Sequence, residues 1–439
     1  MPQIGPDSHL FVMLFGQTLS CLLVSADYAA VHSLSEHFSV QVPQDFGLDQ
    51  LDNLLPSVLK LWGQPIGLKL AAPNARLDPV LMFDGKEIGG ISLIVEPRYD
   101  IKDYRSSVLS VEPIVYGEKE QVKWGARYME VISASDMIFV LLQWDSIAVL
   151  VFSREKKPET SLQVDEFRLE NDTLADLSKT RIRSLMSVNI KHLDLQDHLS
   201  NFFARKTITS KSFEVHDILR SYVTASLFSF KDRCFSRFGI ETEDAVLVVS
   251  GSLAAALPKE DLMLSVVDGL QLKGRYKIVL DRELRSIAGG MSFARRNFVM
   301  PITEVLQESY IYLSTEKGAS GRVGRQAFRG KVTYCSGSCD DCTSKDGNTG
   351  SDDLLVGQTG QICTIDVSGI GSVLIKPDKY TYFPNLVRSG EYLRLDFTND
   401  VVKVIIDCRK IPVIYGPDVL SNHRRLAEWR RGLSLSAYV

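Results

Sequence analysis

The chain has 439 residues, of which 45% are hydrophobic and 24% charged, and its formal net charge is -4. This length suits two or three domains rather than a single core, and the nearly balanced charge argues against a general affinity for nucleic acid or anionic membranes. Seven cysteines, an odd number in a long chain, do not resemble a disulfide framework and favour a reducing compartment. We therefore expect a cytoplasmic protein.

The first apolar run covers residues 10–26. No basic residue precedes it, and Gly, Gln, Thr and Ser interrupt it, so we expect neither a signal peptide nor a transmembrane segment. Two apolar stretches, residues 10–15 and 20–25, instead predict a β-hairpin with a glycine-containing turn.

A second hairpin is predicted by the apolar stretches 137–142 and 147–152. The turn between them contains Asp145 but no glycine, and an aspartate is a residue that turns favour in any case. The following segment, residues 162–178, is polar and acidic, and we expect a solvated linker or helix face there.

An apolar strand, residues 246–249, follows two segments with helical spacing, residues 188–203 and 213–238. A helix that leads into a buried strand is typical of an α/β lobe. The next residues, Ser250-Gly251-Ser252, allow a tight turn because the central residue has no Cβ. A short apolar run then ends at Pro258.

Beyond this turn the pattern continues with a helix predicted over residues 261–270 and a strand over 276–280. From residue 326 onward, short apolar runs separated by Gly, Asp, Asn and Pro predict a β-rich region. A last helix, residues 421–432, carries several arginines, which either form a solvated face or receive an acidic partner.

The order of these motifs resembles the accessory proteins known as glutamate mutase L, relatives of the reactivating factor of a B12-dependent mutase. The resemblance covers roughly the C-terminal 45% of the chain. It is carried by Val246-Leu-Val-Val-Ser-Gly-Ser252, Ser265-Val-Val-Asp-Gly-Leu-Gln271, Ile278-Val-Leu-Asp281, Ile287-Ala-Gly-Gly290, Val404-Ile-Ile-Asp-Cys-Arg-Lys-Ile-Pro412, and the closing helix from His423 to Trp429.

The resemblance implies an α/β fold with an actin-like (ribonuclease H-like) body of two lobes and a β-rich C-terminal domain. We place lobe I at residues 1–155, lobe II at 156–315 and the C-terminal domain at 316–439. In the actin, Hsp70 and sugar kinase superfamily, the first hairpin turn holds phosphate, and a strand running into a glycine turn supports adenosine. The nucleotide-binding positions that this implies are Gly16, Gln17, Thr18, Gly251 and Ser252.

The chain departs from the superfamily at the residues that organise the metal. Leu14 stands where the first hairpin should carry aspartate, and the second hairpin turn lacks the Asp-x-Gly pattern. Without the aspartate, the carboxylate that orders Mg²⁺ beside the phosphates is missing. We therefore expect no cofactor and no catalysis, but a scaffold that binds partner proteins or itself. The alternative is an ATP-dependent reactivating chaperone for a cobalamin-dependent mutase, which would bind ATP or ADP.

A cysteine loop offers a second alternative, a metal or redox module. Cys335, Cys339 and Cys342 have the spacing of an iron–sulfur loop, and thiolates so spaced also suit zinc, with Cys363 or a ligand from a partner protein as the fourth ligand. The flanking residues are strand-like, and the residues that follow are too few for the barrel of a radical-SAM enzyme. Both observations favour a plain loop. These three cysteines are the candidate metal ligands of the sequence.

Overall fold

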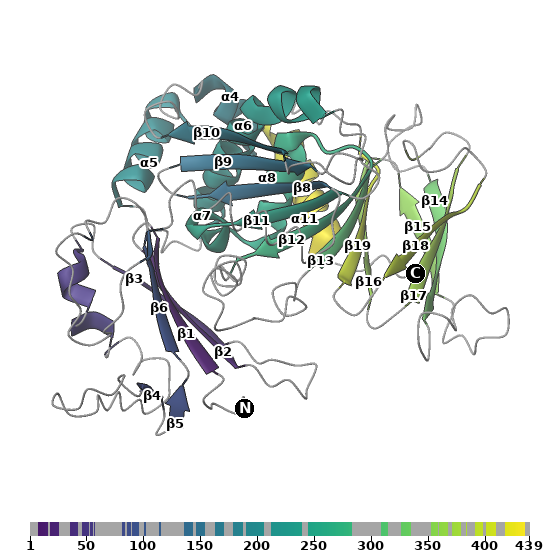
Figure 1. The fold of residues 1–439 in the computed structure, drawn as a ribbon. Helices are drawn as coiled ribbons and strands as arrows, with labels where there is room; N and C mark the ends of the chain where they lie inside the picture. The colour runs from purple at the N-terminus through teal and green to yellow at the C-terminus, as the bar shows by residue number, and fades with distance from the viewer. Residues whose placement is uncertain are drawn as a thin grey trace.

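The structure is a computed structural model (Figure 1). It describes residues 8–15, 18–25, 36–42, 46–51, 53–55, 57, 81–83, 86–88, 90–95, 101, 114–115, 136–143, 146–153, 163–170, 179–187, 190–205, 212–238, 245–282, 309–314, 326–334, 353–358, 360–367, 371–378, 383, 391–397, 401–409 and 418–434.

The N-terminal sheet has five strands in the order β3-β2-β1-β6-β7. Three strands form an antiparallel meander, and β6 and β7 then follow parallel to β1. The strands are β1 (Ser8–Phe15), β2 (Thr18–Ser25), β3 (Glu36–Gln41), β6 (Gly90–Val95) and β7 (Ile114–Val115).

The predicted N-terminal hairpin is confirmed, with Phe15 paired to Thr18 at its end. One face of this sheet buries Leu10, Val12 and Leu14, because alternate residues of a strand point to the same side. The short 3₁₀ helix η1 (Leu48–Gln50) contributes Leu48 to the same core. Two short strands, β4 (Leu81–Phe83) and β5 (Lys86–Ile88), pair with each other.

The central sheet has eight strands in the order β10-β9-β8-β11-β12-β13-β19-β16. Its strands are β8 (Asp136–Leu142), β9 (Ser146–Ser153), β10 (Gln163–Glu170), β11 (Ala245–Ser250), β12 (Arg275–Asp281), β13 (Ser309–Ser314), β16 (Ile362–Asp366) and β19 (Val401–Asp407).

One strand order occurs in both sheets. In the central sheet, β8, β9 and β10 form an antiparallel meander, and β11 and β12 follow parallel to β8. The N-terminal sheet repeats this order and these orientations with β1, β2, β3, β6 and β7. Two lobes built on one repeated topology are what an actin-like body requires, and the predicted α/β class is confirmed.

Helices cover one face of the central sheet, as Figure 1 shows for α6, α8 and α11. Helix α8 approaches α6 closely at Gly269, where a Cβ would lie 2.7 Å from the Cβ of Leu227. The helices are α4 (Lys179–Leu185), α5 (His192–Arg205), α6 (Phe213–Phe238), α7 (Ser252–Ala256), α8 (Lys259–Leu270) and α11 (Val419–Ser434). Among the residues that the structure describes, no helix combines the length and apolarity needed to span a lipid bilayer.

The β-rich C-terminal region is also confirmed. Its own sheet is antiparallel, in the order β15-β14-β17-β18. Phe328 and Val373 of this sheet share a buried core with Leu313 and Val404 of the central sheet. The strands are β14 (Gln326–Tyr334), β15 (Asp353–Gln358), β17 (Gly371–Pro377) and β18 (Leu393–Phe397).

The structure differs from the sequence prediction at the acidic segment 162–178. Part of it, β10, is a strand that pairs with β9 along its whole length and forms one edge of the central sheet. The prediction of a linker or helix face was wrong there. Edge strands tolerate charged residues, whereas the sequence pattern alone made these residues look like part of a solvated segment.

Sheet membership also differs from the proposed division into domains. The hairpin β8–β9 precedes residue 155, yet it pairs with β11 of the second unit. Strands β16 and β19 follow residue 316, yet they complete the same central sheet. A grouping by sheets would therefore place both segments with residues 156–315.

Candidate functional site

The turn after β11 is built around Gly251. Its φ angle is 117°, a backbone conformation that residues with a side chain rarely adopt. A Cβ at this position would lie 2.3 Å from the carbonyl oxygen of Leu142. The glycine therefore lets the end of β11 lie directly against the end of β8, where the two strands pair.

The polar side chains at this edge of the sheet bind one another. Ser250 Oγ donates a hydrogen bond to Asp281 Oδ2 over 2.8 Å, and both residues are buried at the carboxyl ends of β11 and β12. Arg282 Nη2 donates to the carbonyl oxygen of Ala255 over 3.1 Å, which ties β12 to α7. Ligands of open α/β sheets bind at such carboxyl ends.

The structure describes three of the five predicted nucleotide-binding positions. Thr18 begins β2, Ser252 begins α7, and Gly251 forms the turn just described. Gly16 and Gln17 lie outside the described residues. Because most of the first turn lies outside the described residues, its position relative to the Gly251 turn is not tested, and the nucleotide site stays a prediction.

The candidate metal ligands Cys335, Cys339 and Cys342 also lie outside the described residues. Cys363, the proposed fourth ligand, is buried and shares a hydrogen bond with Cys408, which lowers the pKa of Cys363 and raises that of Cys408 well above its ordinary value. Within the described segments, no group of three or more His, Cys, Asp or Glu is placed to hold a metal ion.

A buried ionic cluster lies where α8 meets the end of β19. Arg409 donates from Nη2 to Asp268 over 2.8 Å and to Asp407 over 2.7 Å. Tyr312 donates its hydroxyl proton to Asp407 Oδ2 over 2.9 Å. All four side chains are nearly inaccessible to solvent. Because each charged group faces an opposite charge inside the protein, the cluster holds α8, β13 and β19 together.

The closing helix α11 completes this cluster. The guanidinium carbon of Arg409 lies 4.6 Å from the ring centre of Trp429, in a cation–π contact. Trp429 Nε1 donates to the carbonyl oxygen of Gly360 over 3.2 Å. Asp268, Arg409 and Trp429 come from three of the motifs that carry the family resemblance, and they meet at one place. Their wide separation in the sequence gives no sign of this contact.

Burial and opposite charges compete in this cluster. Burial raises the pKa of Asp268, and the charge of Arg409 opposes that rise without cancelling it. Burial lowers the pKa of Arg409, but the carboxylates of Asp268 and Asp407 outweigh it and hold the pKa well above the usual range. Burial, followed by the charge of Asp407, raises the pKa of Tyr312. Arg409 therefore stays charged, and its role here is structural.

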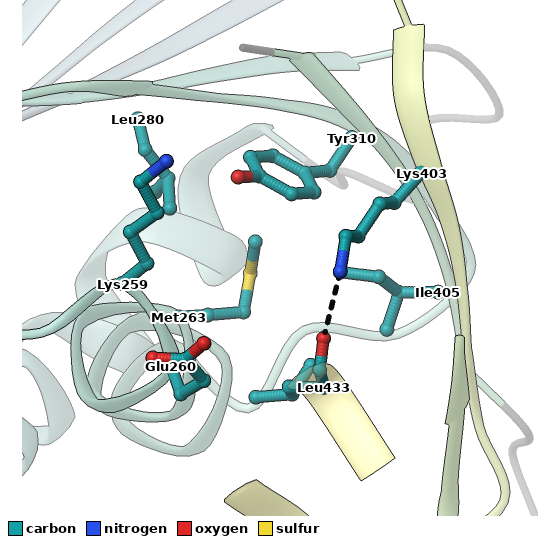
Figure 2. A pocket seen from close by; sticks show the side chains of 8 residues that line it. All are labelled: Lys259, Glu260, Met263, Leu280, Tyr310, Lys403, Ile405 and Leu433. Carbon is teal, nitrogen blue, oxygen red and sulfur yellow. Dashed lines mark hydrogen bonds between the residues drawn. The ribbon is translucent and has the colours of Figure 1, made fainter. Parts of the chain in front are cut away.

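A cavity of about 320 Å³ lies between α8, α11 and the central sheet (Figure 2). Its lining comes from five elements, α8, β12, β13, β19 and α11, so no local sequence motif could have indicated it. The lining residues are Lys259, Glu260, Met263, Leu280, Tyr310, Lys403, Ile405 and Leu433.

No family model matches the chain, and no curated protein is similar to it in sequence. Among solved structures, the chain is similar to the ethanolamine utilization protein EutJ from Carboxydothermus hydrogenoformans, with 10% identity over 64% of this chain and 88% of the other, at a TM-score of 0.35. It is similar to a Bacteroides thetaiotaomicron protein with an actin-like ATPase fold and unknown function, with 10% identity over 66% and 97%, at a TM-score of 0.30. A non-polymerisable pCBH ParM mutant matches with 9% identity over 66% and 99%, at 0.34. Likenesses of this degree concern the fold and not the activity.

Proposed function

We propose that the chain is a non-catalytic cytoplasmic scaffold or adaptor with an actin-like fold, related to the glutamate mutase L-like proteins, that binds partner proteins. The observation that carries this proposal is the buried cluster of Asp268, Arg409 and Asp407. These acidic and basic residues belong to the motifs on which the family resemblance depends. They contact one another and join α8 to β19. Their placement favours a structural role over contact with a substrate.

The first hairpin supports the same proposal. Phosphoryl transfer needs carboxylates that face the metal ion and the phosphates. Leu14, at the position where the superfamily uses aspartate, has no exposed surface and packs in the core with Leu19 and Val95. An apolar side chain in that setting provides no oxygen for a cation.

A capture experiment at native abundance tests the scaffold role. The full chain, tagged at its own locus, is purified gently and its partners are quantified by mass spectrometry and chemical cross-linking, with an untagged strain as control. We expect one or a few partners at near-equal abundance in a complex larger than the 49.0 kDa chain. Recovery of the chain alone at its own mass would contradict the proposal.

The same complex separates the scaffold from the reactivating chaperone. A chaperone driven by nucleotide should release or remodel its partner when Mg²⁺ and ATP are added, because its two states must differ in affinity for that partner. A scaffold keeps the partner bound. Release that requires ATP and is blocked by EDTA would favour the chaperone.

A further inference from the structure

Two buried cysteines meet near the edge of the central sheet. Cys363 lies on β16 and pairs with Ile406 of β19, and Cys408 follows two residues after that partner. Because alternate residues of a strand point to the same side, both thiols face the same way, and both belong to the core that the central sheet shares with the C-terminal sheet. A hydrogen bond joins the two thiol groups.

The backbone around Cys408 keeps it beside β16. Its N–H donates to the carbonyl oxygen of Gln361 over 3.0 Å, and its carbonyl oxygen accepts from the N–H of Gly360 over 2.9 Å. The two cysteines are therefore diagonal neighbours on adjacent strands, whose Cα atoms typically lie about 7–8 Å apart. A disulfide usually needs a Cα separation of about 4.4–6.8 Å. A bond between the two sulfur atoms thus requires only a small approach of the end of β19 to β16.

Such an approach would act on the buried ionic cluster. Arg409 is the residue after Cys408 and binds Asp268 of α8. Gly360, which binds the backbone of Cys408, also accepts the hydrogen bond from Trp429 Nε1 of α11. The backbone neighbours of the thiol pair therefore contact the residues that attach α8 and α11 to the sheet.

We propose that Cys363 and Cys408 form a reversible disulfide when the protein meets hydrogen peroxide. The sulfur of Cys363, which is 7% exposed against 2% for Cys408, attacks one oxygen of the peroxide. The O–O bond breaks, a sulfenic acid forms on Cys363, and water leaves. The sulfur of Cys408 then attacks the sulfenic sulfur, so that the S–S bond forms, the S–O bond breaks and a second water leaves. The thiols lose two electrons to the peroxide, and their protons end in the two waters.

A dithiol reductant reverses the reaction by thiol–disulfide exchange. Disulfides in a reducing compartment are usually transient and redox-sensing, so a pair that opens again suits the cytoplasmic location proposed above. The disulfide shifts Arg409 relative to Trp429, and the attachment of α11 thereby responds to oxidation. This inference goes beyond the scaffold role and does not depend on it.

Peptide mapping of the native full chain by mass spectrometry tests the disulfide. The chain is treated with hydrogen peroxide without denaturant, remaining thiols are blocked, and the peptides are compared with and without dithiothreitol. We expect a Cys363–Cys408 linkage, lighter than its two free peptides by two hydrogen atoms and fully reversed by dithiothreitol. Cys21, buried in a separate core, is the matched control and should stay a thiol. Absence of the linkage while the chain stays folded, or equal oxidation of Cys21, would overturn the proposal.

Variants separate this pair from general oxidation. In Cys408→Ala the sulfenic acid of Cys363 has no partner thiol, so dimedone should label it, whereas the parent chain should give little label. Cys363→Ala should leave Cys408 as a free thiol. If one variant fails to fold, the other decides. Equal dimedone labelling of the parent chain and Cys408→Ala, or oxidation of Cys408 that Cys363→Ala leaves unchanged, would overturn the proposal.

Tryptophan fluorescence tests the link to α11. Oxidation should change the emission of the parent chain more than that of Trp429→Phe, because Arg409 lies against the Trp429 ring. Dithiothreitol should restore the original emission. Equal changes in the two proteins would overturn the link between the disulfide and the attachment of α11.

Discussion

Asp268 and Arg409 lie 141 residues apart in the sequence, yet Arg409 Nη2 donates a hydrogen bond to Asp268 Oδ1 over 2.8 Å. The contact joins α8, which follows the β11 turn, to the end of β19, the strand next to the edge strand β16 of the central sheet. Because Arg409 also binds Asp407 and contacts Trp429, this pair joins α8, β19 and α11 within the α/β body.

Removing the cation of this pair should destabilise the protein strongly. Arg409→Met leaves Asp268 and Asp407 buried together without a counter-charge, and breaking a buried pair in this way typically costs about 3–5 kcal/mol. Urea unfolding followed by circular dichroism measures the loss.

Arg394→Ala is the matched control for that variant. Arg394 binds Asp396 over 2.8 Å, but both side chains are largely exposed, at 43% and 70%. Such a surface pair should contribute no more than about 1 kcal/mol. Equal losses in the two variants would show that the buried cluster does not hold the fold together.

Gly251→Ala should destabilise the β11 turn for two reasons, its φ angle of 117° and the 2.3 Å approach of a Cβ to the Leu142 carbonyl oxygen. Gly274→Ala shares the first reason only, because its φ is 92° but no atom lies within 4 Å of a Cβ there. In chemical unfolding, we expect Gly274→Ala to lower the free energy of unfolding by about 1–2 kcal/mol. Gly251→Ala should lower it by at least about 2 kcal/mol more. Similar losses would refute the close approach of β8 and β11.

Stability at alkaline pH should depend on Cys21. Burial raises the pKa of its thiol from 9.0 to about 12. A pKa that is raised in the folded state means that the stabilisation is complete below the unfolded pKa of 9.0 and is lost as pH rises from there towards 12. The expected loss is about 1.4 kcal/mol per pH unit within that window.

The comparison of wild type with Cys21→Ala isolates this effect from other titrating groups. Both proteins are unfolded with urea at about pH 8 and about pH 10, and the two pH-dependent changes are subtracted. The wild type should lose more stability than the variant over this interval. An identical pH dependence would mean that the Cys21 thiol is not buried in the N-terminal sheet.

Trp429→Phe keeps an aromatic ring over Arg409 but removes the Nε1 donor that binds the Gly360 carbonyl oxygen over 3.2 Å. We expect a loss of about 1 kcal/mol, the usual contribution of one such hydrogen bond. Trp429→Leu removes the cation–π contact as well and should cost more. Thermal unfolding of both variants checks this order. A smaller loss of stability for Trp429→Leu than for Trp429→Phe would contradict a stabilising cation–π contact with Arg409.

The sequence predicts correctly those strands and hairpins whose own residues show a clear pattern of apolar runs and turns. The hairpins β1–β2 and β8–β9 and the strand β11 are apolar runs bounded by turn residues, and the structure contains them. Strand β10 escaped prediction because its pairing with β9, rather than its own acidic sequence, makes it a strand. Local patterns carry no information about such pairing.

The candidate site was less accessible to sequence reasoning. The motif around Asp407 and Arg409 was recognisable, but nothing in it indicates that Asp268 is the partner, since the two residues meet only in the folded chain. Likewise, Lys259 and Tyr310 lie on a helix and a strand far apart in the sequence, and only the packed structure places both at one cavity.

ATP turnover tests the central claim most directly. The purified full chain is assayed for phosphate release from ATP with Mg²⁺, with EDTA as the blank and Arg394→Ala as a preparation control that should carry over any contaminating ATPase. The account predicts a rate no higher than the blank, because Leu14 gives the first hairpin no carboxylate for a metal ion. A Mg²⁺-dependent rate that co-purifies with the folded chain and disappears when Gly251→Ala distorts the β11 turn would contradict it.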